Sequence, residues 1–514
     1  MAHHFANVIP ARLLMWQRVR EYAVPLSMIE TATARRAVGD WAGACAAARI
    51  DVDLDLRAVR DRHGTDLVTR LRADLRRLAP DLLRWHMPRT APDGRLRPGL
   101  TISLARYGSS GATPLQLVVR TPPARADAGQ RMSLALWEES GNGVPGHPPH
   151  PHPHPDRRFR LDLHRHLWDA GRSGELARRC GAGGTPSMGP PDRPRAPGRP
   201  GPMGLLYPPD LPDLPDRPTV HDASWASARW AAEAELLLRA EGRPREAFTV
   251  RLGARSRAVL ELVAPDDSHA PTFRPLREAL PPQEVAALPV LPEAAVRVLP
   301  DLELLRAGLV AAERLHPLVA AALTASGSVA AYGSAPAAGA APEPGDPHRV
   351  ECRGEVHRIA LRDGVLTAVD HDAAQLRREE LLVALGGPAL PCLRAIDAVH
   401  RNPEALPAVR ERLGHGDVAG ALAVVEGLLG PGAILRDGPL REELESAAAR
   451  RIDHGLFRSG LVAVHPGAGG AGGGNASGFG HADTGHRPRL DRRTPLAVRR
   501  KRSSRARPRT GLTG

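Results

Sequence analysis

Hydrophobic residues recur along the first 140 residues with two different periods. A helical period begins after Thr65, where apolar side chains repeat at three- and four-residue intervals and fall on one face. Pro80 is expected to end this helix, because proline cannot donate a backbone hydrogen bond. The apolar positions of the predicted helix are Leu67, Val68, Leu71, Leu75 and Leu78.

A two-residue period follows in three segments, in which apolar and polar positions alternate. The apolar positions are Leu100, Ile102 and Leu104, then Leu115, Leu117 and Val119, then Met132, Leu134 and Leu136. Gly108 to Gly111 has the composition of a turn, and Pro122-Pro123 closes the second segment. This pattern predicts an antiparallel three-stranded meander packed on helices. Residues 8–140 are therefore expected to form an N-terminal α+β domain.

Residues 141–218 interrupt the hydrophobic pattern with Pro, Gly, His and Arg. Such a segment buries too little apolar surface to offset the entropy of ordering it, so we expect a disordered linker. Residues 159–170 are an apolar island within it. They are expected to form a short helix that docks on the first domain.

A second α+β region is expected at 219–466. It contains a helix capped by Asp222, paired strands at 248–252 and 258–263, and a long helix at 301–325 with a kink at Pro317. An Ala/Gly/Pro-rich stretch at 326–347 is expected to be flexible.

The clearest local signal is a β-hairpin at 355–370. Asp363-Gly364 fits a two-residue turn whose positions both need positive φ, and the register then pairs Leu361 with Leu366. Asp372 and Gln375 predict the start of the next helix. Further helices are expected at 392–401, 405–413, 418–429 and 439–453. Residues 467–514 are Gly-rich and then basic, and we expect a disordered tail.

One eight-residue block occurs twice with few differences. It begins at Gly39-Asp40 and again at Gly416-Asp417. The chain shows no repeat of 34 residues, so a tetratricopeptide array is not inferred. A shared way of starting a helix, or coincidence in an Ala/Gly-rich chain, is the favoured interpretation.

The net charge of +13 is concentrated near the C-terminus. Residues 481–514 carry eleven Arg or Lys against two Asp, and Lys501 is the chain's lysine. The high arginine content elsewhere is interpreted first as codon bias and only second as phosphate-binding chemistry. Within the tail, Arg499, Arg500, Lys501 and Arg502 are candidate nucleic-acid contacts, although no aromatic residues are interleaved to stack on bases.

Histidines supply the candidate metal ligands. His150, His152 and His154 alternate with proline, which favours an extended helix whose side chains diverge. A solvated linker is therefore favoured over a metal site. The four cysteines lack the short spacing of zinc ligands, and Cys352 is expected to be a core residue. His357 is expected opposite Asp370 as a cross-strand polar pair.

Motifs for catalysis and cofactor binding are not found. The glycines at 467–472 match a dinucleotide-binding pattern, but more glycine follows where a helix is required. We therefore predict no catalytic residue and no cofactor, and we favour a non-enzymatic protein.

Three functions stay open. The leading expectation is an interaction or scaffold protein with an unidentified protein partner. The second is a nucleic-acid-associated protein that binds through residues 481–514. The third is a metal-dependent enzyme whose ligands meet only in the fold, such as His63, His86, His221 and His357. The N-terminus lacks the apolar run of a signal peptide and no segment reaches the length of a membrane span, so a cytoplasmic location without membrane contact is expected.

Limited proteolysis of the native chain tests this organisation. Early cuts are expected within 141–218 and after about residue 466, with 326–347 cleaved next, because low hydrophobic density leaves backbone open to a protease. Mass spectrometry of the fragments locates the cuts. A single resistant fragment that spans 141–218 would contradict the predicted linker.

Overall fold

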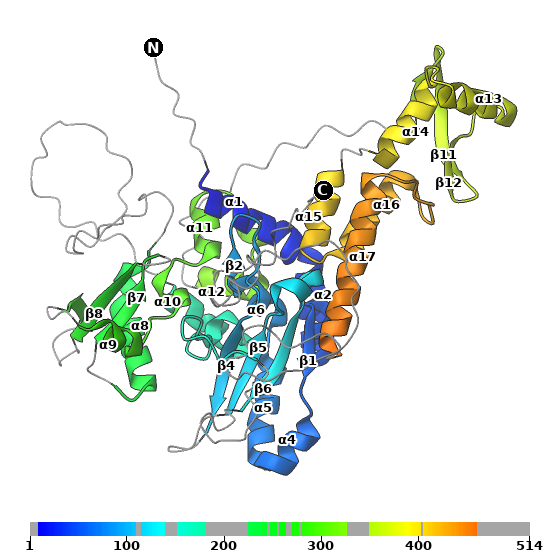
Figure 1. The fold of residues 1–514 in the computed structure, drawn as a ribbon. Helices are drawn as coiled ribbons and strands as arrows, with labels where there is room; N and C mark the ends of the chain where they lie inside the picture. The colour runs from blue at the N-terminus through cyan, green and yellow to red at the C-terminus, as the bar shows by residue number, and fades with distance from the viewer. Residues whose placement is uncertain are drawn as a thin grey trace, which may run out of the picture.

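The computed structural model describes residues 9–108, 115–138, 152–180, 225–243, 247–253, 256–263, 270–276, 280–325, 349–401 and 405–459. Helices combine with small, largely antiparallel sheets, as the α+β prediction requires (Figure 1). The buried hydrophobic residues form three main clusters, which define three units. The first unit comprises the described residues of 9–180 with 299–325, the second those of 225–298, and the third those of 349–459.

The first unit contains a four-stranded sheet of order β1-β6-β5-β4. Its helices are α1 (Ala11–Arg18), α2 (Leu26–Ala37), α3 (Trp41–Ala47), α4 (Leu56–His63), α5 (Thr65–Arg77), α6 (Pro80–His86), α7 (Leu176–Arg179), α11 (Pro300–Arg306) and α12 (Pro317–Ala325). Its strands are β1 (Ile50–Asp53), β2 (Arg89–Thr90), β3 (Arg95–Leu96), β4 (Thr101–Tyr107), β5 (Leu115–Arg120) and β6 (Met132–Trp137). The predicted meander of β4, β5 and β6 is confirmed, and β1 adds a parallel strand that was not predicted.

The prolines begin helices rather than end or kink them. Helix α5 ends at Arg77, and Pro80 is the first residue of α6. Pro317 likewise begins α12, so the single long helix predicted at 301–325 is two separate helices. Proline suits a first helical position because the amide that it lacks has no partner there.

Residues 152–180 pack against the first unit, inside the range predicted as linker. Phe159, Leu161 and Trp168 are buried in the first core. The amide of Ala79 donates to the carbonyl of Trp168 at 2.8 Å. The predicted docking of 159–170 is therefore seen, but as turns and 3-10 segments instead of the expected α-helix.

The second unit packs one helix and a short helical turn on a three-stranded sheet of order β7-β8-β9. Its elements are α8 (Trp230–Ala240), β7 (Ala247–Arg251), β8 (Arg257–Val263), β9 (Thr272–Pro275), α9 (Pro282–Ala287) and α10 (Glu293–Val296). The predicted strand pair is confirmed, with Phe248 opposite Leu260. Buried residues between Leu299 and Leu323 belong to the first core. This stretch therefore packs with the first unit, although it lies within the predicted second region, 219–466.

The third unit contains the predicted hairpin. Its elements are β10 (Arg349–Cys352), β11 (Glu355–Arg362), β12 (Val365–Ala368), α13 (Ala373–Ala384), α14 (Pro391–Arg401), α15 (Leu406–Gly414), α16 (Val418–Leu429) and α17 (Pro439–Arg458). Asp363 and Gly364 have φ of 54° and 76°, and Leu361 pairs with Leu366 as predicted. The carboxylate of Asp372 accepts from the amide of Gln375 at 3.3 Å and caps α13.

The duplicated sequence block has the same local structure in both places. Asp40 and Asp417 each accept a hydrogen bond from the glycine amide three residues later. Gly39 and Gly416 both have positive φ, of 77° and 79°. The repeat is a shared helix start, which confirms that interpretation.

The third unit contacts the first through α15 and α17, and Arg458 at the end of α17 pairs with Asp53 on β1 (Figure 1). Arg49 donates to the carbonyl of His415 at 2.7 Å and to Asp417 at 3.1 Å.

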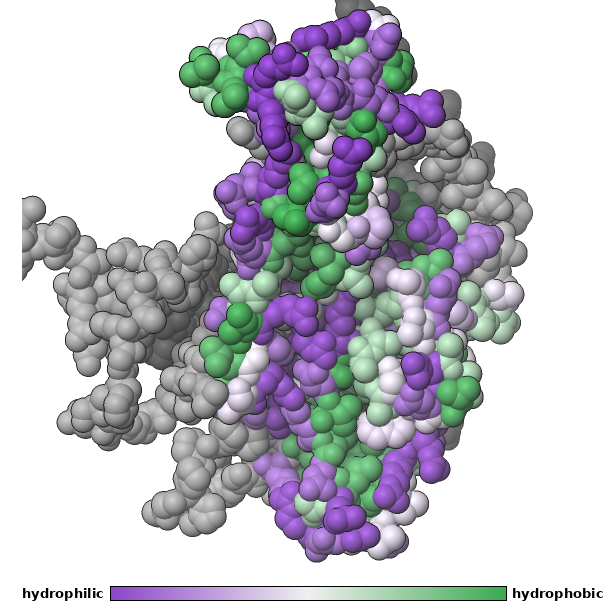
Figure 2. Space-filling view, turned by 90° about the vertical axis from the view of Figure 1, so that its right-hand side faces the viewer, coloured by the Kyte–Doolittle hydropathy of each residue, from purple (hydrophilic) through white to green (hydrophobic). Residues whose placement is uncertain are grey.

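In Figure 2, which faces this side, hydrophobic residues form separate patches among hydrophilic ones. Leu381 in the last turn of α13 and Leu385 directly after the helix are 64% and 85% exposed. Among the described helices, none has both the length and the hydropathy to span a membrane.

Asp301 is expected to contribute strongly to stability. It accepts from Trp85 Nε1 at 2.8 Å and lies 3.5 Å from the guanidinium of Arg20. Burial lowers the pKa of Arg20, and Asp301 opposes that shift. Asp301→Ala leaves Arg20 buried without its counter-charge, so we expect a loss of roughly 3–5 kcal/mol in the free energy of unfolding, measured by urea denaturation. The control Asp437→Ala removes a carboxylate that is 96% exposed and is expected to cost less than about 0.5 kcal/mol. Equal effects of the two substitutions would contradict the assignment.

Candidate ligand-binding site

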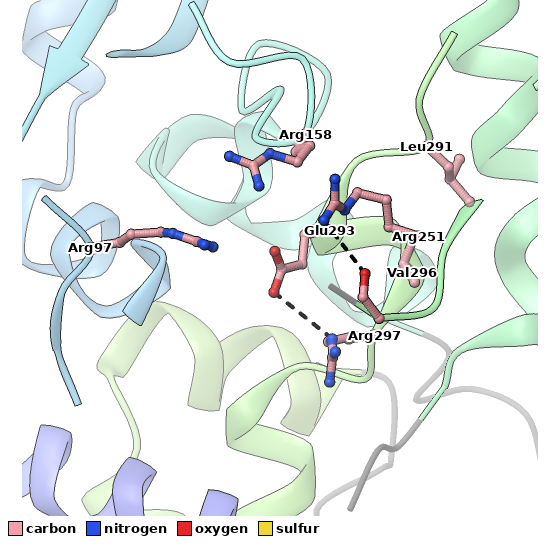
Figure 3. Close-up of a pocket in the computed structure, with 8 residues that line it drawn as sticks. Arg97, Arg158, Arg251, Leu291, Glu293, Val296 and Arg297 are labelled. Carbon is pink, nitrogen blue, oxygen red and sulfur yellow. Dashed lines mark hydrogen bonds and ion pairs between the residues drawn. The ribbon is translucent and has the colours of Figure 1, made fainter. Parts of the chain in front are cut away.

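Four arginines surround a cavity of about 210 Å³ where the first and second units meet (Figure 3). Arg97 follows β3, Arg158 lies in the docked segment 152–180, Arg251 ends β7 and Arg297 follows α10. Arg97 lies across the cavity from Arg251 and Arg297, with Glu293 between them. The cavity therefore draws its walls from three parts of the chain that are distant in sequence.

Main-chain hydrogen bonds hold these walls together. The amide of Glu293 donates to the carbonyl of Arg158 at 2.8 Å, which joins α10 to the docked segment. The amide of Leu291 donates to the carbonyl of Thr249 at 2.8 Å, which joins the same stretch to β7. The Arg297 guanidinium lies 4.9 Å from the ring centre of Trp225. These backbone hydrogen bonds thus fix the relative positions of the segments that carry the lining side chains.

The cavity carries an excess of positive charge. Glu293 is the carboxylate among its lining residues, 3.8 Å from Arg297, and Asp156 pairs with Arg158. Burial lowers the pKa of Arg251, and the nearby charges of Arg158 and Arg97 lower it further. Guanidinium groups bind carboxylate and phosphate with paired hydrogen bonds. The arrangement therefore suits an anionic group.

A larger cavity of about 400 Å³ adjoins the arginine cavity and shares Glu293 and Arg297 with it. Its lining is mainly apolar and comes from α1, the end of α6, the docked segment and the start of α11. The apolar lining residues include Met15, Trp16, Met87, Phe159, Leu161, Leu167, Val298 and Leu299. Its size is typical of sites for small molecules.

Polar atoms without partners lie in this apolar lining. Trp16 Nε1 and both ring nitrogens of His86 are buried and make no hydrogen bond. The nearest carboxylate oxygen to His86 Nε2 is that of Asp301, at 3.8 Å. Unpaired buried polar atoms are costly, and a bound ligand is one way to satisfy them.

No protein-family model, curated protein or solved structure matches this chain.

Among the predicted site residues that the structure describes, His86 lines the apolar cavity and the others line neither cavity. His150, His221 and the tail residues Arg499, Arg500, Lys501 and Arg502 lie outside the described residues. The ring of His154 lies 5.2 Å from that of Trp137. His63 lies at the surface, 3.1 Å from Glu138.

One cluster of potential metal ligands is present in the described part of the chain. It consists of Cys352, His371 and Cys392. His357 contacts this cluster, because its ring centre is 4.2 Å from that of His371. The predicted pairing of His357 with Asp370 is replaced, since Asp370 accepts instead from Arg358 at 2.9 Å.

Sequence reasoning missed the arginine cavity. The arginines share no spacing, and they stand in a chain with 70 Lys or Arg residues, so none is distinctive. A weak signal was available in the apolar island of 159–170, which places Arg158 beside a segment predicted to dock.

The stability of the chain is expected to depend on pH through His86. Burial lowers the pKa of His86 to about 4, and the charge of Asp301 opposes this shift. Between about pH 4 and 6.5 the unfolded chain binds a proton at this position that the folded chain does not. Stability from the neutral imidazole is therefore complete above about pH 6.5 and is lost as the pH falls.

His86→Gln is expected to remove up to about 3 kcal/mol of the stability difference between pH 7 and pH 4, measured by urea denaturation at each pH. The control His63→Gln changes a surface histidine and is expected to leave this difference in place. An unchanged pH dependence in His86→Gln would show that His86 is not the buried neutral group inferred here.

Proposed function

We propose that the chain is a non-enzymatic binding protein whose first two units hold a small amphipathic anion. The ligand class is a carboxylate or phosphate attached to an apolar body. The observation that carries the proposal is the pair of adjoining cavities, one lined by arginines and one mainly apolar, which share Glu293 and Arg297.

The arginine cavity supports the anionic end of this ligand. Arg97, Arg158, Arg251 and Arg297 stand around a space that contains Glu293 as its lining carboxylate. Burial lowers the pKa of Arg251, and the nearby positive charges of Arg158 and Arg97 lower it further. A bound anion would offset that repulsion between like charges. Because the cavity opens between two units, its walls also suit a molecule that binds at their junction.

The second cavity supports the apolar body. Trp16, Phe159 and Leu161 provide apolar surface, which favours binding through removal of that surface from water. His86 and Trp16 add buried nitrogens that can hydrogen-bond a polar group near the junction. The combination of an apolar lining with few polar groups is typical of small-molecule sites.

A protein partner stays a prediction, and so does a cytoplasmic location. The exposed apolar side chains of α13 are typical of interaction surfaces but do not identify a partner. Nucleic-acid binding through residues 481–514 also stays a prediction, because these residues lie outside the described part of the chain. Ligand binding at the junction is compatible with either.

Calorimetric titration with octanoate and with octyl phosphate tests the proposal. Arg251→Met keeps the apolar stem and removes the charge, so we expect binding to weaken roughly 10- to 100-fold, as for loss of a charge-assisted hydrogen bond. Arg239→Met is the matched control, since Arg239 is 68% exposed and pairs with Glu235 on α8. This control is expected to bind like the unaltered chain.

Inorganic phosphate and 1-octanol separate the two halves of the site. Each is expected to bind more weakly than octyl phosphate, because each fills one cavity only. Equal binding of octyl phosphate by the Arg251→Met and unaltered chains would contradict the proposal. Absence of binding by both amphipathic anions would also contradict it.

A further inference from the structure

Three ends of regular elements meet in the third unit and bring together residues that are distant in sequence. Cys352 is the last residue of β10 and precedes a tight turn, in which Arg353 and Gly354 have φ of 59° and 85°. His371 lies just after β12, and Cys392 is in the first turn of α14. Helix α14 packs on both β10 and β12, which places Cys392 beside the other two residues.

The three side chains have the geometry of a metal-binding cluster. One potential ligand atom from each of Cys352, His371 and Cys392 lies within 4.8 Å of the others. Tetrahedral zinc with bonds of about 2.0–2.3 Å separates its ligand atoms by roughly 3.3–3.8 Å, so small side-chain adjustments suffice. Cys352 and Cys392 are fully buried, which removes competition from water.

His357 lies beside this three-residue cluster and is a candidate for a fourth ligand. It lies on β11 opposite Val350, and its ring is tilted by 32° against that of His371, with ring centres 4.2 Å apart. Its Nδ1 is buried and makes no hydrogen bond. Its Nε2 lies 3.6 Å from Glu355, and ligating histidines commonly have a carboxylate beside the second ring nitrogen.

Unpaired imidazole nitrogens distinguish this cluster from an ordinary pair of core cysteines. Nδ1 of His357 and Nε2 of His371 are both buried without a hydrogen-bond partner. Two such atoms beside two thiols in an apolar cluster are unfavourable unless something satisfies them. A metal cation that accepts an electron pair from each thiolate and each imidazole would satisfy all four groups together.

We propose that Cys352, His357, His371 and Cys392 bind one Zn²⁺ ion. Two sulfur and two nitrogen ligands in a closed, buried site favour zinc in tetrahedral coordination. The site has no position left for substrate, so its role is structural. The ion fastens β10 and β11 to the turn after β12 and to α14. The third unit therefore gains a cross-link in a small core built without buried aromatic residues among its described positions.

The test begins with untagged full-length protein purified with zinc and a reductant, then dialysed. Elemental analysis is expected to give about one zinc per chain. Replacing zinc by Co²⁺ is expected to produce thiolate-to-metal charge-transfer absorption and the visible bands of tetrahedral cobalt. Cys352→Ser, Cys392→Ser and His371→Ala should each abolish these bands. Full zinc affinity in His357→Ala would overturn the four-ligand assignment.

Matched controls separate this site from other binding. Cys45→Ala and Cys180→Ala alter buried cysteines outside the cluster and are expected to keep the cobalt spectrum. A chain with His150, His152 and His154 replaced by alanine should retain zinc, which excludes the His-Pro tract as the source.

A direct measurement on the unaltered chain covers variants that fail to fold. Zinc is expected to protect Cys352 and Cys392 from alkylation, and removal of zinc with a chelator should expose both to the reagent. Peptide mass spectrometry identifies the modified cysteines. A Cys352–Cys392 disulfide in reductant-treated protein, or identical alkylation with and without zinc, would overturn the proposal.

Discussion

The carboxylate of Asp301 holds in place α11, whose first residue, Pro300, lines the apolar cavity. It lies at the start of α11 and is 1% exposed, yet it bonds Trp85 on α6 and pairs with Arg20 after α1. The same pair brings the Arg20 guanidinium to 4.1 Å from the ring centre of Trp85. Glu293 to Leu299 lead directly into α11, so the position of α11 sets where the arginine-lined and apolar cavities meet. A second buried pair, Asp81 and His316 at 2.8 Å, fixes the start of α12 in a similar way.

Buried arginines give this aromatic-poor chain long-range connections that its aliphatic side chains do not supply. Arg84 is fully buried and donates to the carbonyls of Ala23, at 3.0 Å, and Gln130, at 2.7 Å. Burial, followed by the nearby charge of Arg49, lowers the pKa of Arg84. Arg49 in turn reaches the third unit through Asp417. The high arginine content was interpreted from composition as codon bias. Some of these arginines nevertheless join separate segments of the fold, because each guanidinium carries five hydrogen-bond donors at the end of a long side chain.

Local physical rules predicted the parts of the fold that depend on neighbours in sequence. Asp363-Gly364 determined its turn and the register of β11 with β12, and alternation of apolar residues identified β4, β5 and β6. The failures arose where a residue has two possible local roles or where the decisive contact is distant. Pro80 and Pro317 can end one helix or begin another, and sequence does not say which. Strand β1 pairs in parallel with β6, so its partner lies beyond a long connection.

The candidate sites show the same limit more strongly, because their residues meet through tertiary packing alone. A search for paired cysteines at short spacing detects metal sites built within one loop. Cys352 and Cys392 instead lie on β10 and α14, and packing of α14 on the sheet brings them together. Sequence did single out His357, yet assigned it Asp370 as its neighbour. Strand register determines which residues lie opposite each other in the sheet. At the end of a sheet it does not determine which side chains make contact, because neighbouring elements also pack there. Asp370 turns to Arg358, and His357 is left against His371 and the two cysteines. Predicting this cluster required knowing which helix covers the hairpin, and that depends on apolar packing across the whole third unit.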